Sequence, residues 1–590
     1  MFTSIKNFFN TNISFLIILI IVVFCVYGKS INYELINLDE NTLIIKNINY
    51  ISDISNIPEF FLESCFYSEE SSYYRPVLTL TFSIESILFG LNSKIYHITN
   101  IILFILNLYL LYIFLLKLNL NKNITKLILI LFAVYPVVSS CCAWVTARND
   151  SLLSIFVILT FINIINYLTT KKTLSLWFLL TFFTLSIFTK ETALIFLLIY
   201  PLFIYLFKYN ISKKQMINLI FGFVFILTVY FAMRHFAVEQ LSISWYIKNI
   251  DVLLKNIING FSVYVYTILT PFYVPIAYLN NDTDIFKIFI VFLFIILLSI
   301  SYYKNIIKRK ILFFGLSIFI FGLLPTFLNM EEIIYFHRLL LPLSGIIIII
   351  IDFFQQLINK KESLKKYFII LSVFLFIIFS FLSFKNTDKY RNNKTFFTNG
   401  YLDVPKYHVF INAVAKFYIE YEKYDKALEL LYLSDKYKPN NYINDIAVVL
   451  CYQDKFDEAE KILNKSIAVG KNKDVAYANL SLIYRERNDY KTALSYAIKA
   501  YEENPYNIDN VVNLARIYRL NNEFSKAIEL YNSLIKFDKN NPVYYYSLGV
   551  LYNDINEKNN AIKFLEKACA IDKNNNLYLR KLEEIKNVED

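Results

Sequence analysis

Five short segments near the end of the chain share one pattern: DKALELL (425–431), DEAEKIL (457–463), KTALSYA (491–497), SKAIELY (525–531) and NNAIKFL (559–565). The alanine of each segment follows the previous one after 32, 34, 34 and 34 residues. Around each alanine the pattern is that of an amphipathic α-helix. We therefore expect residues 391–590 to form a helical repeat with a period near 34 residues.

A second set of positions repeats in register with these alanines. A small residue stands twelve positions before each alanine, and a tyrosine or leucine follows the small residue after three: Ala415 and Tyr418, Ala447 and Leu450, Ser481 and Tyr484, Ala515 and Tyr518, Gly549 and Tyr552. Small side chains let paired helices cross closely, and the larger ones fill the space between them. This is the tetratricopeptide pattern, in which stacked helix pairs form an α-solenoid. We expect about five repeats that bind a peptide or protein, in preference to a purely structural cap.

The composition of the chain as a whole is that of an integral membrane protein. Of the 590 residues, 56% are hydrophobic and only 18% are charged, and the mean hydropathy is +0.44. Globular domains are about 45–50% apolar on a similar count. So few charges cannot cover a water-soluble surface, so the sequence predicts a polytopic membrane domain over 1–390 ahead of the repeats.

Apolar runs near the length that a bilayer requires, about 17–25 residues, define this domain. We expect about eleven spans, at 13–27, 95–117, 126–146, 150–168, 172–189, 191–209, 215–236, 284–303, 311–329, 332–351 and 367–384. No A-x-A cleavage pattern follows the first run, so we interpret it as a retained anchor. Two weaker stretches, 77–91 and 252–272, are expected to lie at the membrane interface.

Basic residues favour cytoplasmic loops, and their distribution predicts the orientation. With a cytoplasmic N-terminus, the inner segments hold 17 basic residues and one acid, Glu362; the basic ones are Lys6, Lys117, Lys122, Lys126, Lys171, Lys172, Lys208, Lys213, Lys214, Lys304, Lys308, Arg309, Lys310, Lys360, Lys361, Lys365 and Lys366. The inner segments therefore carry a net charge of +16 (17 basic residues and one acid), which exceeds the net charge of the whole chain, +11. The basic excess is therefore a topology signal and not a nucleic-acid footprint. It predicts that the loop 29–76 and the repeats are extracytoplasmic, in a bacterial plasma membrane in preference to the endoplasmic reticulum.

Glycine and cysteine usage excludes several kinds of site. The ten glycines are never closer than seven residues, so neither a P-loop nor a Rossmann turn can form. The six cysteines form no CxxC pair and have no histidines at metal-binding spacing.

Ionisable residues gather on the predicted outer side. Asp39 and Glu40 are adjacent carboxylates in the loop 29–76, where one could act as a general base, although such a dipeptide is more often a solvated loop. Ionisable residues at span ends snorkel to the interface, pair with one another or line a cavity. The number of them on one face favours a polar cavity that opens outward and suits the phosphate of a lipid. The basic residues on this side are Arg75, His97, Arg148, Lys190, Arg234, His235, His337 and Arg338.

Several motifs, in this order, resemble the transmembrane and tetratricopeptide-repeat O-mannosyltransferases and their bacterial relatives, within the GT-C glycosyltransferase class. Asn37-Leu-Asp39-Glu40 with Lys46-Asn47 is similar to the family's N-x-D-D and trailing asparagine, with Glu40 in place of the second aspartate. The other similar motifs are Tyr74-Arg75-Pro76, Phe89-Gly90-Leu91-Asn92, Tyr96-His97 with Asn100, Tyr135-Pro136-Val137, Ala143-Trp144, Arg148-Asn149-Asp150, Lys190-Glu191, and His337-Arg338 with Pro342.

The resemblance implies a GT-C fold and the inverting transfer of a sugar, mannose or another hexose, from a polyprenyl-phosphate donor to a protein hydroxyl. It implies that Asp39 is the base and that Glu40 orients it. Arg148, Lys190, Arg75, His97 and Arg338 are the implied candidates for binding the donor phosphate. No cofactor or metal cluster is indicated, although the acidic pair could hold a divalent ion.

Two other functions compete with this one. A glycan polymerase or ligase of the O-antigen type resembles the arrangement less, because such enzymes are expected to carry their basic residues in a large late outer loop. A non-catalytic membrane scaffold with partner-binding repeats would need neither eleven spans nor Asp39.

Overall fold

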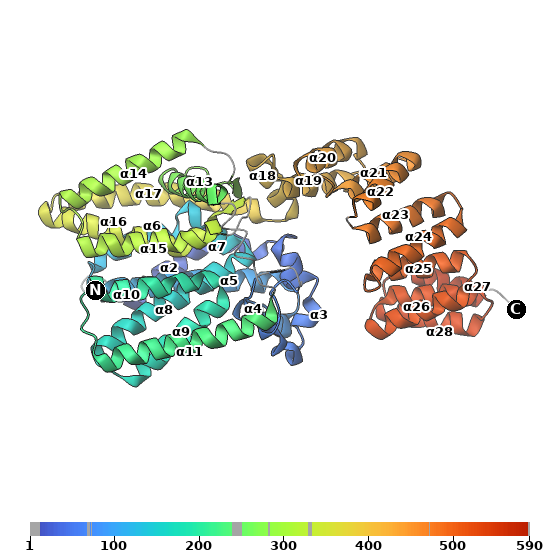
Figure 1. The fold of residues 1–590 in the computed structure, drawn as a ribbon, viewed down its shortest axis with the longest axis horizontal. Helices are drawn as coiled ribbons and strands as arrows, with labels where there is room; N and C mark the ends of the chain where they lie inside the picture. Colours follow the sequence, from blue (N-terminus) through green and yellow to red (C-terminus); the bar gives the residue numbers. More distant parts are fainter. Residues whose placement is uncertain are drawn as a thin grey trace, which may run out of the picture. The chain divides into compact units, whose positions relative to one another are not determined.

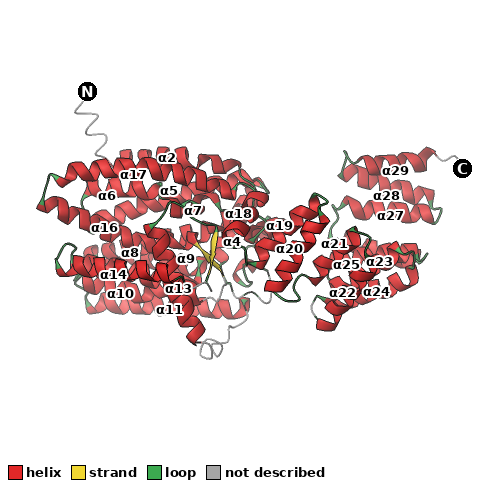
Figure 2. Ribbon diagram, turned by 90° about the horizontal axis from the view of Figure 1, so that it is seen from above, coloured by secondary structure: helices red, strands yellow, loops and turns green. Residues whose placement is uncertain are grey.

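The computed structural model describes residues 12–67, 71, 73–238, 250–280, 284–328, 333–470 and 472–587; Lys6 and the ends of two expected spans at 329 and 332 lie outside these ranges. The chain divides after Val404 into two compact units. Both are built almost entirely from helices, and the described residues contain one small sheet (Figures 1 and 2). The predicted all-α class is confirmed at this level.

The first unit contains most of the long apolar helices. Its helices are α2 (Asn12–Tyr27), α3 (Ile48–Ile51), α4 (Pro76–Phe89), α5 (Ser93–Lys117), α6 (Lys122–Ala133), α7 (Ser140–Ala143), α8 (Arg148–Thr170), α9 (Thr173–Thr189), α10 (Phe196–Leu206), α11 (Lys213–Ala237), α13 (Ile250–Leu269), α14 (Ile285–Tyr303), α15 (Arg309–Leu328), α16 (Leu340–Lys360), α17 (Leu364–Thr387) and α18 (Asn393–Asp403). Strands β1 (Ala277–Leu279) and β2 (Ile333–Tyr335) pair antiparallel, with Tyr278 opposite Ile334.

Nine helices in the described ranges are long and apolar enough to cross a membrane, or ten if the bent pair α6 and α7 is one span. The count differs from the expected eleven in three places. The expected span 126–146 is divided into the bent pair α6 and α7. The expected spans 172–189 and 191–209 become α9 and α10, which are shorter, because a turn at Lys190 and a 3-10 segment at Glu191–Ile195 interrupt the apolar run. Conversely, α13 passes the length and apolarity test, although we expected 252–272 at the interface.

Most of these helices run side by side between two ends of the unit (Figure 1). At one end, the basic end, lie the turns at 117–122, 171–172, 208–213, 304–309 and 361–363, joined by contacts such as Lys117 Nζ to Asn166 Oδ1 at 2.8 Å and Lys308 N to Asp352 Oδ2 at 2.7 Å. At the other, the loop end, lie residues 28–67 and 73–75. Helix α13 contacts the two strand segments, because Asn259 donates to Asn280 O, just after β1, and Tyr264 donates to Tyr335 O, at the end of β2.

The core of the first unit is apolar, with α8 near its centre. In the most apolar part of α8, 78% of the residues are buried, against 6% in α14. Glycines allow the closest helix contact, because a Cβ on Gly345 of α16 would lie 2.2 Å from the carbonyl oxygen of Gly315 on α15. Close approach at small residues is a usual way for apolar helices to pack within a membrane.

The second unit consists of five helix pairs and a last helix. The pairs are α19 (His408–Glu420) with α20 (Tyr424–Tyr437), α21 (Ile443–Tyr452) with α22 (Phe456–Val469), α23 (Lys473–Glu486) with α24 (Tyr490–Glu503), α25 (Ile508–Leu520) with α26 (Phe524–Phe537) and α27 (Pro542–Asp554) with α28 (Lys558–Ile571), followed by α29 (Asn576–Asn587). The five repeated alanines are completely buried.

The turn inside each pair has one residue in the left-handed region: Glu422, Asp454, Asn488, Asn522 and Asn556. At the small-residue position of the last pair, a Cβ on Gly549 would lie 2.6 Å from Leu565 Cγ, so the two helices leave no room for a larger side chain.

Candidate functional site

The loop end of the first unit is closed by contacts between two segments that are far apart in sequence. After α2, Lys29 forms a 2.8 Å ion pair with Asp388, and Glu34 N donates to Arg391 O at 3.0 Å. Asp388 and Arg391 follow directly after α17. The segment that carries Asp39 is therefore fixed at both the beginning and the end of the membrane-like unit.

Asp39 and Glu40 have different surroundings although they are adjacent. Glu40 is 1% exposed and accepts hydrogen bonds from the backbone N–H groups of Ile36 and Val145. Burial raises the pKa of Glu40 to about 8, against the lowering effect of the bonds from Ile36 and Val145. The Asp39 side chain is partly exposed. Glu40 thus ties the loop to the segment before α8, and Asp39 is the member of the pair that solvent can reach.

Arg148 lies inside the unit, at the first turn of α8. Its side chain is fully buried and pairs with Glu85 of α4 at 2.7 Å. The same guanidinium donates to Asn100 Oδ1 at 2.9 Å and to Tyr96 O at 3.0 Å. These contacts join α4, α5 and α8, so the geometry gives Arg148 a role in holding three helices together.

Lys190 pairs with the aspartate of the Arg148-Asn149-Asp150 motif. Its Nζ lies 2.7 Å and 2.8 Å from the two carboxylate oxygens of Asp150, and both side chains are nearly buried. His337 Nε2 approaches the same carboxylate at 3.6 Å. Arg338 and Lys190 line one small polar cavity together with Asp150, and the Arg338 side chain is partly exposed.

Glu191, the next residue, forms ion pairs with two arginines. Arg75 Nε lies 3.2 Å from its carboxylate and Arg234 Nη1 lies 3.8 Å from it. Its other bond comes from the backbone N–H of Tyr74 at 2.7 Å. Burial lowers the pKa of Arg75, but the charge and hydrogen bond of Glu191, together with the Cys65 and Tyr73 charges, outweigh burial and raise that pKa above its usual range.

Cys65 lies close to this group in the first loop, because its backbone N–H donates to Tyr73 O at 3.0 Å. Burial raises the pKa of its thiol to about 12; the Arg75 charge lowers that pKa, and the Glu191 and Asp39 charges raise it. Three charged groups thus act on one buried thiol in the first loop.

His97 is 1% exposed and faces the first loop from α5, with its ring edge-on to that of Tyr33 at 6.2 Å between centroids. His97 therefore borders the first loop and is not part of the ion pairs that Lys190 and Glu191 form.

We name Arg75, Lys190, Arg234 and Arg338 with Asp150 and Glu191 the cationic cluster. Four cations against two carboxylates leave an excess of two positive charges, which is suited to an anion such as a phosphate. Glu85, Asp150, Glu191 and Arg234 were not among the expected phosphate-binding residues. Asp150 and Glu191 could have been found from their place inside the motifs, and Arg234 from its place at the end of a span, whereas Glu85 carries no local signal. Within the described residues, no group of three or more His, Cys, Asp or Glu could hold a metal ion.

Comparisons with known proteins concern the second unit. Family models of the tetratricopeptide repeat match residues 484–551 and 542–575. No curated protein matches the sequence. Similar solved structures include YrrB, described as a TPR protein with an unusual peptide-binding site, at 16% identity over 32% of this chain and 97% of that one, with a TM-score of 0.25.

Two further neighbours are MamA 41-end from Desulfovibrio magneticus RS-1, at 15% identity over 29% of this chain and 97% of that one with a TM-score of 0.25, and a thermophilic TPR protein of Thermus thermophilus, at 17% identity over 30% and 98% with a TM-score of 0.27. Together, the family models and the five helix pairs show that the C-terminal region carries tetratricopeptide repeats, which generally bind peptides or proteins.

Proposed function

We propose that the protein is a membrane glycosyltransferase that moves a hexose, such as mannose, from a polyprenyl-phosphate donor to a hydroxyl group of a protein. The reaction takes place at the loop end, which we assign to the extracytoplasmic side. The repeats bind the acceptor or a partner protein. The observation that carries this proposal is the cationic cluster in the part of the unit where the first loop carries a partly exposed Asp39.

The cluster provides charge for a donor phosphate. Charged residues inside a membrane domain are costly and are retained where they pair or act on a ligand. Here the cations exceed their carboxylate partners, so a phosphate entering from the bilayer meets a positive field. Among the expected phosphate-binding residues, Arg75, Lys190 and Arg338 belong to this cluster. Arg148 and His97 are buried in contacts of their own and support the site indirectly.

The chemistry requires one base and one leaving group. The acceptor oxygen forms a bond to the anomeric carbon while the bond from that carbon to the phosphate oxygen breaks. Asp39 takes the hydroxyl proton, and the electron pair leaves with the polyprenyl phosphate, whose charge the cluster stabilises. Glu40 positions Asp39, because its bonds to Ile36 and Val145 fix the loop.

A reconstitution experiment tests the proposal. The full chain in bilayers is given labelled polyprenyl-phosphate hexoses and a mixture of acceptor proteins, and transfer is compared between wild type and Asp39→Asn. The matched control is Asp53→Asn, because Asp53 lies in the same loop and its cap to Ser55 N can be made by an asparagine oxygen. Transfer by wild type and Asp53→Asn, with loss in Asp39→Asn, is expected. Transfer that survives in Asp39→Asn would assign the base to another residue.

A second candidate function is a membrane-anchored scaffold, which the tetratricopeptide repeats favour by themselves. A scaffold would bind its partner equally well with Asp39→Asn and would transfer no sugar with any donor. A glycan polymerase or ligase would instead transfer to a glycan acceptor, so a glycan in place of the protein mixture distinguishes it.

A further inference from the structure

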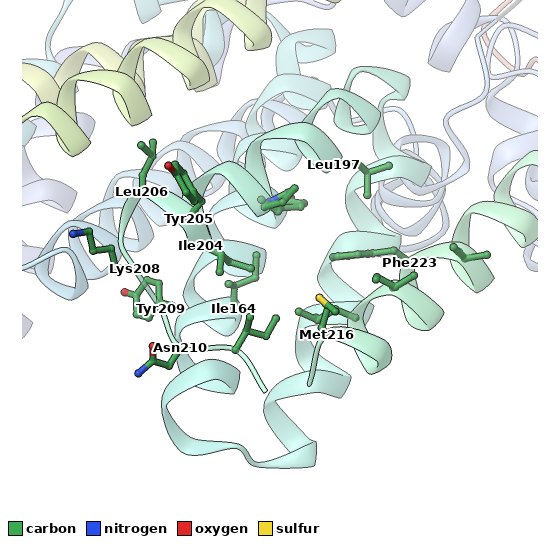
Figure 3. Close-up of a pocket in the computed structure, with 16 residues that line it drawn as sticks. Ile164, Leu197, Ile204, Tyr205, Leu206, Lys208, Tyr209, Asn210, Met216 and Phe223 are labelled. Atoms are coloured by element: carbon green, nitrogen blue, oxygen red, sulfur yellow. The ribbon is translucent and has the colours of Figure 1, made fainter. Parts of the chain in front are cut away.

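A groove of about 920 Å³ opens on the side of the first unit between α10 and α11 (Figure 3). It exists because the two helices pack against different neighbours. Helix α10 is short, contains Pro201, and packs on α15 through Phe203 and Phe314, whose ring centroids are 4.9 Å apart. Helix α11 is held against α9 at Gly222, where a Cβ would lie 2.6 Å from Leu180.

The wall of the groove is apolar along most of its length. Ile164 and Leu219 lie at its base, and Ile220 and Val224 of α11 are more than half exposed along its edge. Figure 3 shows Leu197 and Phe223 toward one end and Lys208 and Asn210 at the other. The length and lining suit a hydrocarbon chain with a polar group at one end.

The polar end carries positive charge. Lys208 lines it, exposed Lys213 and Lys214 follow in the first turn of α11, and Lys310 lies 5.0 Å from the ring of Phe207. None of the described residues that line the groove is acidic. These lysines belong to the basic end, which is the headgroup depth of one leaflet if the helices cross a membrane.

We propose that this groove binds an anionic glycerophospholipid of the leaflet at the basic end. An acyl chain occupies the apolar groove between α10 and α11, and the lipid phosphate contacts Lys208 and Lys213. Hydrocarbon burial and attraction of an anionic headgroup to lysines act together in such a site.

The occupant is not the sugar donor, because the two polar sites are at opposite ends. Lys213 begins α11 and Arg234 lies in its last turn, so the two are separated by about 30 Å of helix at 1.5 Å per residue. A phosphate held at Lys208 cannot reach the cationic cluster. The inference therefore rests on the membrane embedding that the proposed function assumes, and not on sugar transfer.

The test is lipid retention by the purified full chain, measured by native mass spectrometry after exchange into detergent with one lipid at a time. The probes are phosphatidylglycerol, phosphatidylcholine with the same acyl chains, and polyprenyl phosphate. Wild type is expected to retain several times more phosphatidylglycerol than phosphatidylcholine. Lys208→Gln with Lys213→Gln removes that preference, and Ile220→Trp fills the groove and lowers retention of both phospholipids.

Matched controls lie on α17. Lys365→Gln with Lys366→Gln removes two exposed lysines at the same end, and Ile370→Trp changes an isoleucine that is 55% exposed, as Ile220 is. Both are expected to retain lipid as wild type does. If Ile220→Trp unfolds, Val224→Phe is the second groove-filling variant.

Equal retention of the two phospholipids by wild type, or loss in the α17 controls as large as in the groove variants, overturns the proposal. Retention of polyprenyl phosphate in the groove, lost with Ile220→Trp, would replace the phospholipid by an isoprenoid. A protein that transfers no sugar but shows the expected retention leaves the lipid site intact, so the two proposals fail separately.

Discussion

Lys190 Nζ donates to both carboxylate oxygens of Asp150, at 2.7 and 2.8 Å, so that the turn after α9 is bound to the first turn of α8. The two residues are 40 positions apart in sequence, and both side chains are buried, with 8% and 6% of their surface exposed. A buried pair of this kind is valuable mainly because breaking it leaves one charge without compensation.

Lys190→Met is therefore expected to lower the free energy of unfolding by about 3 kcal/mol, since Asp150 then stays buried without its main partner. Thermal unfolding in detergent measures the loss. The double variant Lys190→Met with Asp150→Leu removes both charges and should regain part of the stability. A double variant no more stable than Lys190→Met alone would contradict the role assigned to the pair.

Arg148→Lys should affect stability rather than donor binding. Lysine can keep the contact with Glu85 but not the bonds to Asn100 and Tyr96 O together, because it lacks the planar fork of donors. We expect a loss of about 2 kcal/mol in unfolding free energy. In the reconstituted assay, the KM for the lipid donor should stay near that of wild type.

The comparison variant is Arg338→Lys, because the Arg338 side chain is partly exposed at the cavity that Lys190 lines. Here we expect a higher KM for the donor with little change in thermal unfolding. The opposite outcome, in which Arg148→Lys raises KM and Arg338→Lys destabilises, would exchange the two roles.

The buried carboxyl group of Glu40 is expected to make the free energy of unfolding depend on pH. Its pKa is raised by burial to about 8 in the folded protein, so the folded state binds this proton more tightly than the unfolded state. The stabilisation is complete below the ordinary glutamate pKa and is lost as the pH rises through about 8. Wild type should lose stability between about pH 5 and pH 8, and Glu40→Gln should show a flatter profile.

The control for this profile is Asp53→Asn. Hydrogen bonds from Ser55 lower the pKa of Asp53, so its contribution has the opposite sign and lies at acid pH. Its profile between pH 5 and 8 should follow wild type. A Glu40→Gln profile as steep as that of wild type would assign the pH dependence elsewhere.

Glu422 occupies a turn position at which its equivalents in the last three repeats are asparagine. Its φ is +57°, in the region that glutamate adopts with strain and asparagine tolerates better. Glu422→Asn should stabilise the first helix pair by about 0.5–1 kcal/mol, and Asn522→Glu should destabilise its pair by a similar amount. Hydrogen exchange of the amides in α19–α20 and α25–α26 of the full chain measures both. Unchanged exchange in both variants would show that these turns are not strained.

The repeats could be predicted from sequence because their signal is periodic. Ala493 and Ser481 report the same packing as Ala527 and Ala515, so one register is supported many times over. The first unit has no such repeat, so each of its spans had to be inferred from one apolar run. The run around Lys190 is apolar on both sides, yet α10 is too short to count as a span, and only the tertiary structure shows it.

The candidate site was predictable as a region but not as a set of pairs. The motifs indicated that Arg148 and Lys190 belong to a site. They did not show that the Arg148 side chain is buried against Glu85 and Asn100. Glu85 is 63 positions from Arg148, and Arg234 is far from Glu191 in sequence. No spacing rule within one helix connects such residues.

The closure of the loop end has a consequence for synthesis. Lys29 meets Asp388 across 359 positions. At about 5–20 residues per second, the later residue leaves the ribosome roughly 20–70 seconds after the earlier one. During that interval the segment carrying Asp39 lacks this anchor, so the loop end can close only after α17 has been made.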